Sequence, residues 1–195
     1  EMNINDAKNA ILVGEFVLDE IHLKNHIKVK YADNLSSELL RDSSGRVYIF
    51  SSDGIIKKIG GSASKGGIKS TLSLYTSSMT GSPGKPRFIL HLIIRDELIC
   101  RNKVTIHMIN AKKFVSEVKG LYSASSVEVA AFQEMEDMCR KDYLAIENNH
   151  PDWNFKENNK NYPSKYILEH NNYHEKRYER VILEESQNKY NEKTL

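Results

Sequence analysis

The sequence predicts an α+β fold, with a small mixed or antiparallel sheet of about three strands, flanking helices, and helical extensions at both ends. Two runs rich in β-branched and aromatic residues, at 46–50 and 55–60, surround a turn. Two long stretches with helical composition occupy residues 128–148 and 164–189. Apolar residues make up 39% of the 195 residues and charged residues 28%, which is typical of a globular chain.

The N-terminal part carries apolar side chains at spacings near three and four, which predicts one helix or two short helices over residues 6–24. These side chains are Ala7, Ile11, Leu12, Phe16, Val17 and Ile21. A second short helix is expected at 38–41, and a Ser/Gly turn at 42–45 ends this part. We therefore expect a helical N-terminal extension over residues 1–44.

The central part begins with a predicted β-hairpin, because the two strand-like runs are joined by a short turn that ends in Gly54. A glycine-rich segment follows, and residues 68–75 are expected to form a short helix. Residues 81–86 contain Gly and Pro and predict a loop. Residues 87–94 and 104–109 are expected to be strands.

The second half is expected to be mostly helical. Ser125 and Ser126, placed before Glu128, are typical of a helix start, since serine caps free N–H groups and an acidic first turn suits the helix dipole. This helix should end before Pro151. Residues 152–162 are expected to be irregular, and residues 156–195 to form a helical, basic C-terminal extension.

Charge is unevenly distributed, although the formal net charge is only +2. Residues 54–119 hold twelve Lys/Arg and three Asp/Glu, whereas residues 120–150 hold two Lys/Arg and six Asp/Glu. The basic block is either a phosphate-facing surface or an ordinary solvated face. No apolar run reaches the roughly 18–20 residues needed to cross a bilayer, so we expect a cytoplasmic protein without a membrane partner.

The predicted hairpin carries the most specific pattern, with Tyr48 in Val47-Tyr48-Ile49 and Lys58 in Lys58-Ile59-Gly60. This pair of segments resembles the signature of the GIY-YIG nucleases, which is named after two tripeptides on adjacent strands. The tyrosine stands one position earlier than in the name, and lysine replaces the second tyrosine, as in some restriction-type members. The resemblance covers about residues 45–155 and implies that Tyr48 and Lys58 are catalytic.

The resemblance also implies a cation on the helix after the hairpin, where the family has an arginine. Lys69 stands at the comparable distance, and Lys65, Arg87 and Arg95 are alternatives. Lysine can neutralise a phosphate but lacks the bidentate guanidinium fork.

A glutamate at the start of a later helix binds the metal in this family, and Glu128 matches that place. Glu134 and Glu136 are alternatives, because some members place the glutamate nearer to a Pro-x-x-Asn motif. Residues 151–154 resemble that motif, which implies that Asn154 helps to anchor the site. The cofactor implied is Mg²⁺ or Mn²⁺.

These residue types suit phosphodiester hydrolysis, which needs an activated water and neutralised charge. One carboxylate can hold Mg²⁺ as a Lewis acid. A tyrosine beside cations can lose its proton and then act as a general base. Lys58 could lower the pKa of that tyrosine, and Lys69 could neutralise the phosphate.

We therefore expect a Mg²⁺-dependent endonuclease of the restriction or phage type that cuts double-stranded DNA as a homodimer or tetramer. The alternative is a non-catalytic DNA-binding or DNA-processing module on the same fold, motivated by the lysine at position 69. A third possibility is an interaction protein whose hairpin matches by accident.

Other patterns are weaker. His170 and His174 have metal-ligand spacing on a helix but lack the HExxH glutamate. Pro151-Asp152 followed by residues 157–160 faintly resembles a PD-(D/E)xK nuclease motif, but the spacing differs. Residues 173–180 interleave cations with aromatic side chains, which suits either DNA contact or a solvated helix.

Overall fold

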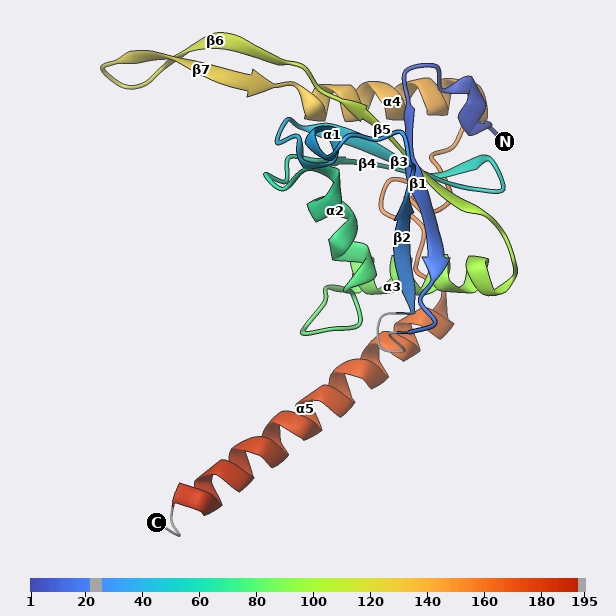
Figure 1. Cartoon of the computed structure of the whole chain (residues 1–195), viewed down its shortest axis with the longest axis vertical. Helices are drawn as coiled ribbons and strands as arrows, with labels where there is room; N and C mark the ends of the chain where they lie inside the picture. The colour runs from blue at the N-terminus through green and yellow to red at the C-terminus, as the bar shows by residue number, and fades with distance from the viewer. Residues whose placement is uncertain (22–25, 193–195) are drawn as a thin grey trace.

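Five antiparallel strands form the central sheet, in the order β2-β1-β5-β3-β4 (Figure 1). The computed structural model describes residues 1–21 and 26–192. The strands of this sheet are β1 (Ile11–Leu18), β2 (Ile27–Tyr31), β3 (Arg46–Ser52), β4 (Ile55–Ser62) and β5 (Val104–Asn110). A second, two-stranded sheet pairs β6 (Lys113–Lys119) with β7 (Ala124–Ala130) and projects from the body of the molecule. The α+β class is confirmed, but the predicted three strands are too few.

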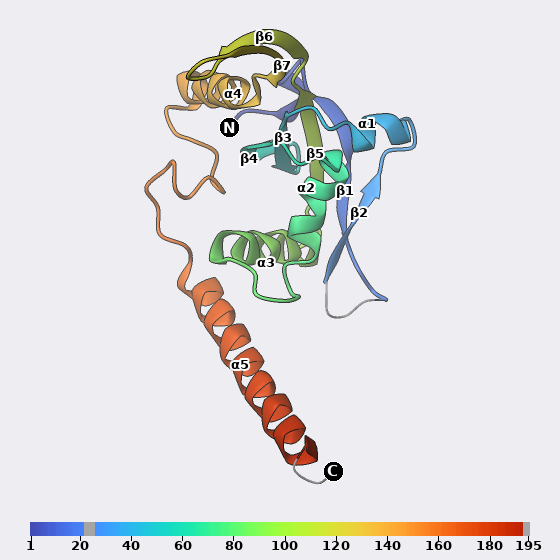
Figure 2. The same ribbon diagram turned by 90° about the vertical axis from the view of Figure 1, so that its left-hand side faces the viewer.

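Helices cover both faces of the central sheet (Figure 2). The helices of the described chain are η1 (Ile4–Asp6), α1 (Ser37–Arg41), α2 (Gly67–Thr76), α3 (Lys85–Ile99), α4 (Phe132–Glu147) and α5 (Ser164–Glu192). One buried cluster joins the sheet to α2, α3 and the start of α5, and a smaller one joins it to α4 and the N-terminal segment. Within the described part of the chain, no helix is long and apolar enough to span a membrane.

The predicted hairpin is confirmed as β3 and β4, with Tyr48 opposite Gly60. Its turn is tighter than expected, because β3 continues to Ser52 and only Asp53 and Gly54 connect the strands. Both have positive φ angles, 46° and 83°, as a two-residue turn of this twist requires. Every residue of β3 is buried, so the hairpin lies in the middle of the fold.

The helical prediction for residues 6–24 is wrong in the described part, since residues 11–18 form β1; positions 22–24 lie outside the described residues. A bulge between Leu12 and Gly14 shifts the register of β1 against β5. Buried side chains therefore fall at Val13 and Phe16, three positions apart, where a regular strand would alternate. Ile11 and Leu12, which contributed to the helix-like spacing, are exposed on this strand, so the spacing of apolar residues does not follow the buried face.

The strand prediction for residues 87–94 is also wrong, because these residues form the middle of α3. Residues 88–94 are all buried, as α3 packs between the sheet, α2 and α5. A continuous apolar run does not distinguish a buried strand from a buried helix. Pro86, in the first turn of the helix, was the local signal for a helix start.

The predicted helix start at Ser125 is wrong as well. Residues 124–130 pair with β6 as β7, and α4 begins at Phe132. Glu128 therefore lies on a strand of the projecting hairpin rather than in the first turn of a helix. The expected helices near 38–41, 68–75 and 164–189 and the strand at 104–109 are confirmed as α1, α2, α5 and β5.

Candidate active site

Two tyrosine hydroxyl groups meet beneath the central sheet. Tyr48 on β3 and Tyr75 at the end of α2 share a hydrogen bond of 2.5 Å between their oxygens. Both side chains are buried, and burial is the largest cause that raises the pKa of each. For Tyr48, the neighbouring Tyr75 and the charge of Glu136 raise the pKa further, whereas Arg140 acts in the opposite direction. Tyr48 is therefore a neutral phenol in the free protein at neutral pH.

Two glycines of β4 make room for the site. A Cβ atom at Gly60 would overlap the ring and the hydroxyl group of Tyr48. A Cβ atom at Gly61 would overlap the Oε2 atom of Glu136, which comes from α4. β4 is an edge strand of the sheet, so side chains from both layers can meet along it. The Gly-Gly pair thus lets a tyrosine and a carboxylate approach the same short piece of backbone.

A cluster of four charged groups lies at this edge. The guanidinium group of Arg140 forms an ion pair with Glu136, one helical turn earlier, and another with Glu157 at 3.0 Å. The charges of Glu157, Arg140 and Glu136 all act on the amino group of Lys58. Burial lowers the pKa of Lys58, and the two carboxylates only partly offset this effect. The two positive and two negative charges of the cluster thus balance one another without a bound ligand.

Asn154 connects the segment after α4 to β4. Its Oδ1 atom accepts a hydrogen bond from the Ile59 N–H at 3.0 Å, and its Nδ2 atom donates one to the Ile59 carbonyl at 2.9 Å. The side chain is completely buried. One residue earlier, the Trp153 N–H donates to the Lys57 carbonyl at 2.8 Å. Asn154 therefore holds this segment against the strand that carries Lys58.

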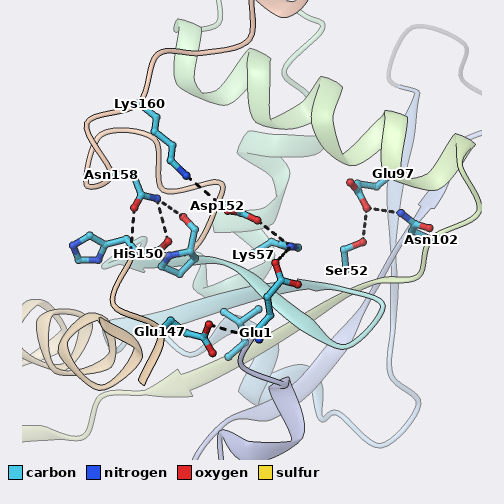
Figure 3. A network of polar contacts seen from close by, with 12 residues as sticks. Glu1, Ser52, Lys57, Glu97, Asn102, Glu147, His150, Asp152, Asn158 and Lys160 are labelled. Atoms are coloured by element: carbon cyan, nitrogen blue, oxygen red, sulfur yellow. Dashed lines mark hydrogen bonds and ion pairs between the residues drawn. The ribbon is translucent and has the colours of Figure 1, made fainter. Parts of the chain in front are cut away.

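Further polar contacts hold the same segment in place (Figure 3). Lys57 lies between Asp152 and Glu1, with N···O distances of 3.0 Å and 3.3 Å. Asn158 accepts a bond from the His150 N–H and donates to the carbonyl groups of His150 and Pro151, all within 3.1 Å. The segment is irregular, as predicted, yet it is well bonded to the sheet.

A cavity of about 230 Å³ opens beside the tyrosine pair. Lys58 lines it from β4 and Tyr75 from α2, whereas α3, including Arg87, and the segment after α4 form the rest of the wall. The charge of Arg87 also reaches the Tyr75 hydroxyl group. The cavity is therefore continuous with the candidate site.

The structure brings together Tyr48, Lys58 and Asn154, three of the five residues singled out in the sequence. Of the three candidate carboxylates, Glu136 lies at the site with its side chain 15% exposed. Glu128 is 67% exposed and pairs with Lys113 at 3.4 Å on the projecting hairpin. Glu134 is exposed on α4. Contact geometry therefore favours Glu136 over Glu128.

The candidate cations also divide into those at the site and those away from it. Lys69 is exposed on α2, and none of the contacts found among the described residues joins it to Tyr48, Lys58 or Glu136. Lys65 is also exposed, and Arg95 is engaged by Asp96 and Glu169. Arg87 and Arg140 remain as guanidinium groups near the site.

Sequence reasoning missed Tyr75 and Arg140, and it considered Glu157 only within the weak PD-(D/E)xK match. Arg140 follows Glu136 by four residues on a predicted helix, so an ion pair between them was a readable signal. No local signal places Tyr75 or Glu157 beside Tyr48 and Lys58, because that proximity depends on how α2 and the segment after α4 pack on the sheet.

The donor set suits a hard divalent cation. Mg²⁺ is usually held by one or two carboxylates and several waters, and the Glu136 carboxylate, in the space left by Gly61, provides such a ligand. In the described ranges, no group of three or more His, Cys, Asp or Glu side chains is placed to hold a metal. The Nε2 atoms of His170 and His174 lie 3.1 Å apart on α5, without a third ligand from these residue types.

Comparison with known proteins gives a structural relationship only. No protein-family model and no curated protein sequence matches the chain. The structure of a mutant of EndoII from bacteriophage T4 is similar with a TM-score of 0.50 and 12% identity, over 79% of this chain and 99% of that chain. Restriction endonuclease HPY188I, in complex with product DNA, gives a TM-score of 0.44 and 16% identity, over 77% and 84% of the two chains. At this level of identity, the similarity to EndoII shows a shared fold.

Proposed function

We propose that this protein is a DNA endonuclease of the GIY-YIG type that hydrolyses phosphodiester bonds with the help of Mg²⁺. The observation that carries the proposal is the meeting of three chemical groups at β4. Tyr48 provides a hydroxyl group beside Gly60, Glu136 provides a carboxylate beside Gly61, and Lys58 provides a cation earlier on the same strand, within reach of the charge of Glu136. The fold shared with EndoII of bacteriophage T4 supports the same reading.

Each residue has a distinct role in this proposal. Glu136 would hold Mg²⁺, which when bound supplies a Lewis acid for the phosphate and the attacking water. Tyr48 would take the proton of that water as its oxygen bonds to phosphorus and the leaving oxygen departs. Lys58 and Arg87 would neutralise the phosphate. Asn154 would keep the wall of the site fixed.

Tyr48 must ionise before it can accept a proton. In the free protein the charge of Glu136 is one of the causes that raise the pKa of Tyr48. That charge is balanced when Glu136 holds a divalent cation, so loading the site favours the phenolate. Metal binding and base activation would thus be coupled through one carboxylate.

Plasmid cleavage with Mg²⁺ tests the proposal. Both Glu136→Gln and Tyr48→Phe should lower the cleavage rate by about 10²-fold or more, because each removes a group used in the transition state. Glu128→Gln is the matched control, since it changes an exposed glutamate on the hairpin and should leave the rate within about twofold. If Glu136→Gln cut plasmids at the full rate and Glu128→Gln did not cut them, the metal-binding carboxylate would be Glu128 instead of Glu136.

The second candidate function is DNA binding without cleavage. The ion pair between Arg140 and Glu136 favours it, because a guanidinium group already neutralises the carboxylate that a metal would need. In that case the wild type would retard duplex DNA on a gel but leave plasmids intact at every Mg²⁺ or Mn²⁺ concentration. Removal of Arg140 would then not produce cleavage either.

A further inference from the structure

The wall of the cavity beside Lys58 is unusually aromatic. Trp153, Phe155 and Tyr162 line it from the segment after α4, and Tyr75 lines it from α2. The rings of Phe155 and Tyr162 pack against each other with their centroids 4.9 Å apart. Both residues are half-buried, so part of their surface remains accessible. Aromatic walls of this kind bind nucleobases by stacking, with little dependence on the base.

Cationic side chains surround the same space. Arg87 and Lys156 line the cavity, are exposed, and form no ion pair with any carboxylate among the described residues. Lys58, which is half-buried, lines the cavity as well. Glu157 also lines the cavity, but Arg140 balances its charge at 3.0 Å. The combination of flat rings and unpaired cations matches a base and its phosphate.

The wall is fixed before a ligand binds. Asn154 bonds to both backbone groups of Ile59. Figure 3 shows that Lys57 pairs with Asp152 and that Asn158 closes the loop onto His150. A preformed site avoids the entropy cost of ordering a loop when the ligand binds. These contacts therefore hold the aromatic residues of the segment in a fixed position.

We propose that this cavity binds one unpaired nucleotide of the DNA, adjacent to the bond that is cleaved. The base lies against Phe155 and Tyr162, and its phosphate meets Lys58 and Arg87. A volume of about 230 Å³ accommodates a single base but not a base pair, so the nucleotide must leave the stack of the duplex. The inference rests on the proposed endonuclease function and adds a substrate preference to it, for DNA in which a base is already unpaired.

Trp153 is the only tryptophan of the chain, so its fluorescence reports on this cavity. Without metal, the wild type should show a saturable change in emission with deoxyadenosine monophosphate. Deoxyribose 5-phosphate and inorganic phosphate should bind about tenfold more weakly, because they lack the stacked base. Equal binding of phosphate alone would overturn the proposal, since the cavity would then be an anion site.

Two substitutions test the aromatic wall. Phe155→Leu and Tyr162→Leu should each weaken nucleotide binding by about 5- to 100-fold, given the usual contribution of one stacked ring. Tyr178→Leu, which changes an exposed tyrosine of α5 outside the cavity, is the matched control and should bind as the wild type does. Lys156→Ala, at an exposed position, keeps the test decisive if a leucine variant fails to fold, and should weaken binding of the nucleotide. Unchanged affinity in folded variants of the wall would contradict the proposal.

A DNA assay separates this inference from the proposed function. Binding by the Glu136→Gln variant should be about tenfold tighter for a duplex with a single bulged base than for the fully paired duplex, and Phe155→Leu should abolish the difference. Cleavage of plasmids without this preference would sink the nucleotide site alone. Nucleotide binding without any plasmid cleavage by the wild type would sink the endonuclease alone.

Discussion

Gly60 lies under the ring of Tyr48, and the position of the hydroxyl pair depends on its missing side chain. A methyl group there would overlap the ring, which is locked by Phe50 and Tyr75 in the core. Gly60→Ala should therefore lower the free energy of unfolding by about 1–3 kcal/mol, measured in urea. Gly120→Ala is the control, because its added carbon would make only ordinary contacts with Ser123, and it should change stability by less than about 0.5 kcal/mol. Equal stabilities for the two variants would contradict the overlap.

His91 on α3 is completely buried behind Tyr75. Its Nδ1 atom lies 2.7 Å from the Tyr75 carbonyl, and burial lowers its pKa from 6.5 to about 4, with the charges of His26 and Arg95 adding to the decrease. As pH falls below 6.5, the unfolded chain takes up a proton that the folded chain does not. Stability is thus lost as the pH falls from about 6.5 towards 4.

This loss can be isolated with His91→Asn, which keeps an N–H donor but does not titrate. Between pH 7 and pH 5, the unfolding free energy of the wild type should fall by about 2 kcal/mol more than that of the variant. Urea unfolding at the two pH values measures it. An equal decrease in both proteins would show that His91 is not the group responsible.

Single residues were predictable where their neighbours in sequence are also their neighbours in space. Tyr48 and Lys58 lie on two strands joined by a tight turn, so their proximity follows from the hairpin alone. The choice between Glu128 and Glu136 depended on where α4 begins. That boundary is set by the pairing of β7 with β6, which a local helix-start signal at Ser125 could not reveal.

The secondary structure of β1 and α3 was harder to predict than that of the β3–β4 hairpin. β1 was read as helical because its apolar residues do not alternate in the sequence, and α3 was read as a strand because its middle is a continuous apolar run that is buried on all sides. In both cases the positions of apolar residues depend on tertiary packing, and their spacing in the sequence does not identify the backbone conformation. These errors do not affect the positions of Tyr48, Lys58 and Asn154, since these residues lie on β3, on β4 and in the segment that follows α4.

That segment depends on one side chain more than on any other. Asn154→Ala would leave both polar backbone groups of Ile59 without their partner at a buried position, which should cost about 2–4 kcal/mol of unfolding free energy. The emission of Trp153 should also shift towards that of an exposed indole before global unfolding. Asn161→Ala, at an exposed position of the same segment, should leave both readouts unchanged. Wild-type stability in Asn154→Ala would show that the segment does not need this anchor.

At the scale of the whole molecule, the site lies at the open edge of the sheet, and two elements extend beyond the body. β6 and β7 project at one end and α5 at the other (Figure 1). The tip of the hairpin carries Leu121 and Tyr122 at 92% and 100% exposure. One chain has one cluster of Tyr48, Lys58 and Glu136, so a double-strand cut requires either two chains or two successive events.

Mixing active and inactive copies distinguishes these routes. If two chains cut together, wild type mixed with Glu136→Gln at constant total protein forms pairs with one working site, after time for exchange. Nicked circular plasmid should then accumulate, and linear product should fall roughly as the square of the wild-type fraction. Mixing with Glu128→Gln should leave the ratio of nicked to linear product unchanged. A decrease of linear product in simple proportion to the wild-type fraction would mean that one chain makes both cuts during one encounter with the DNA, so that paired chains are not needed.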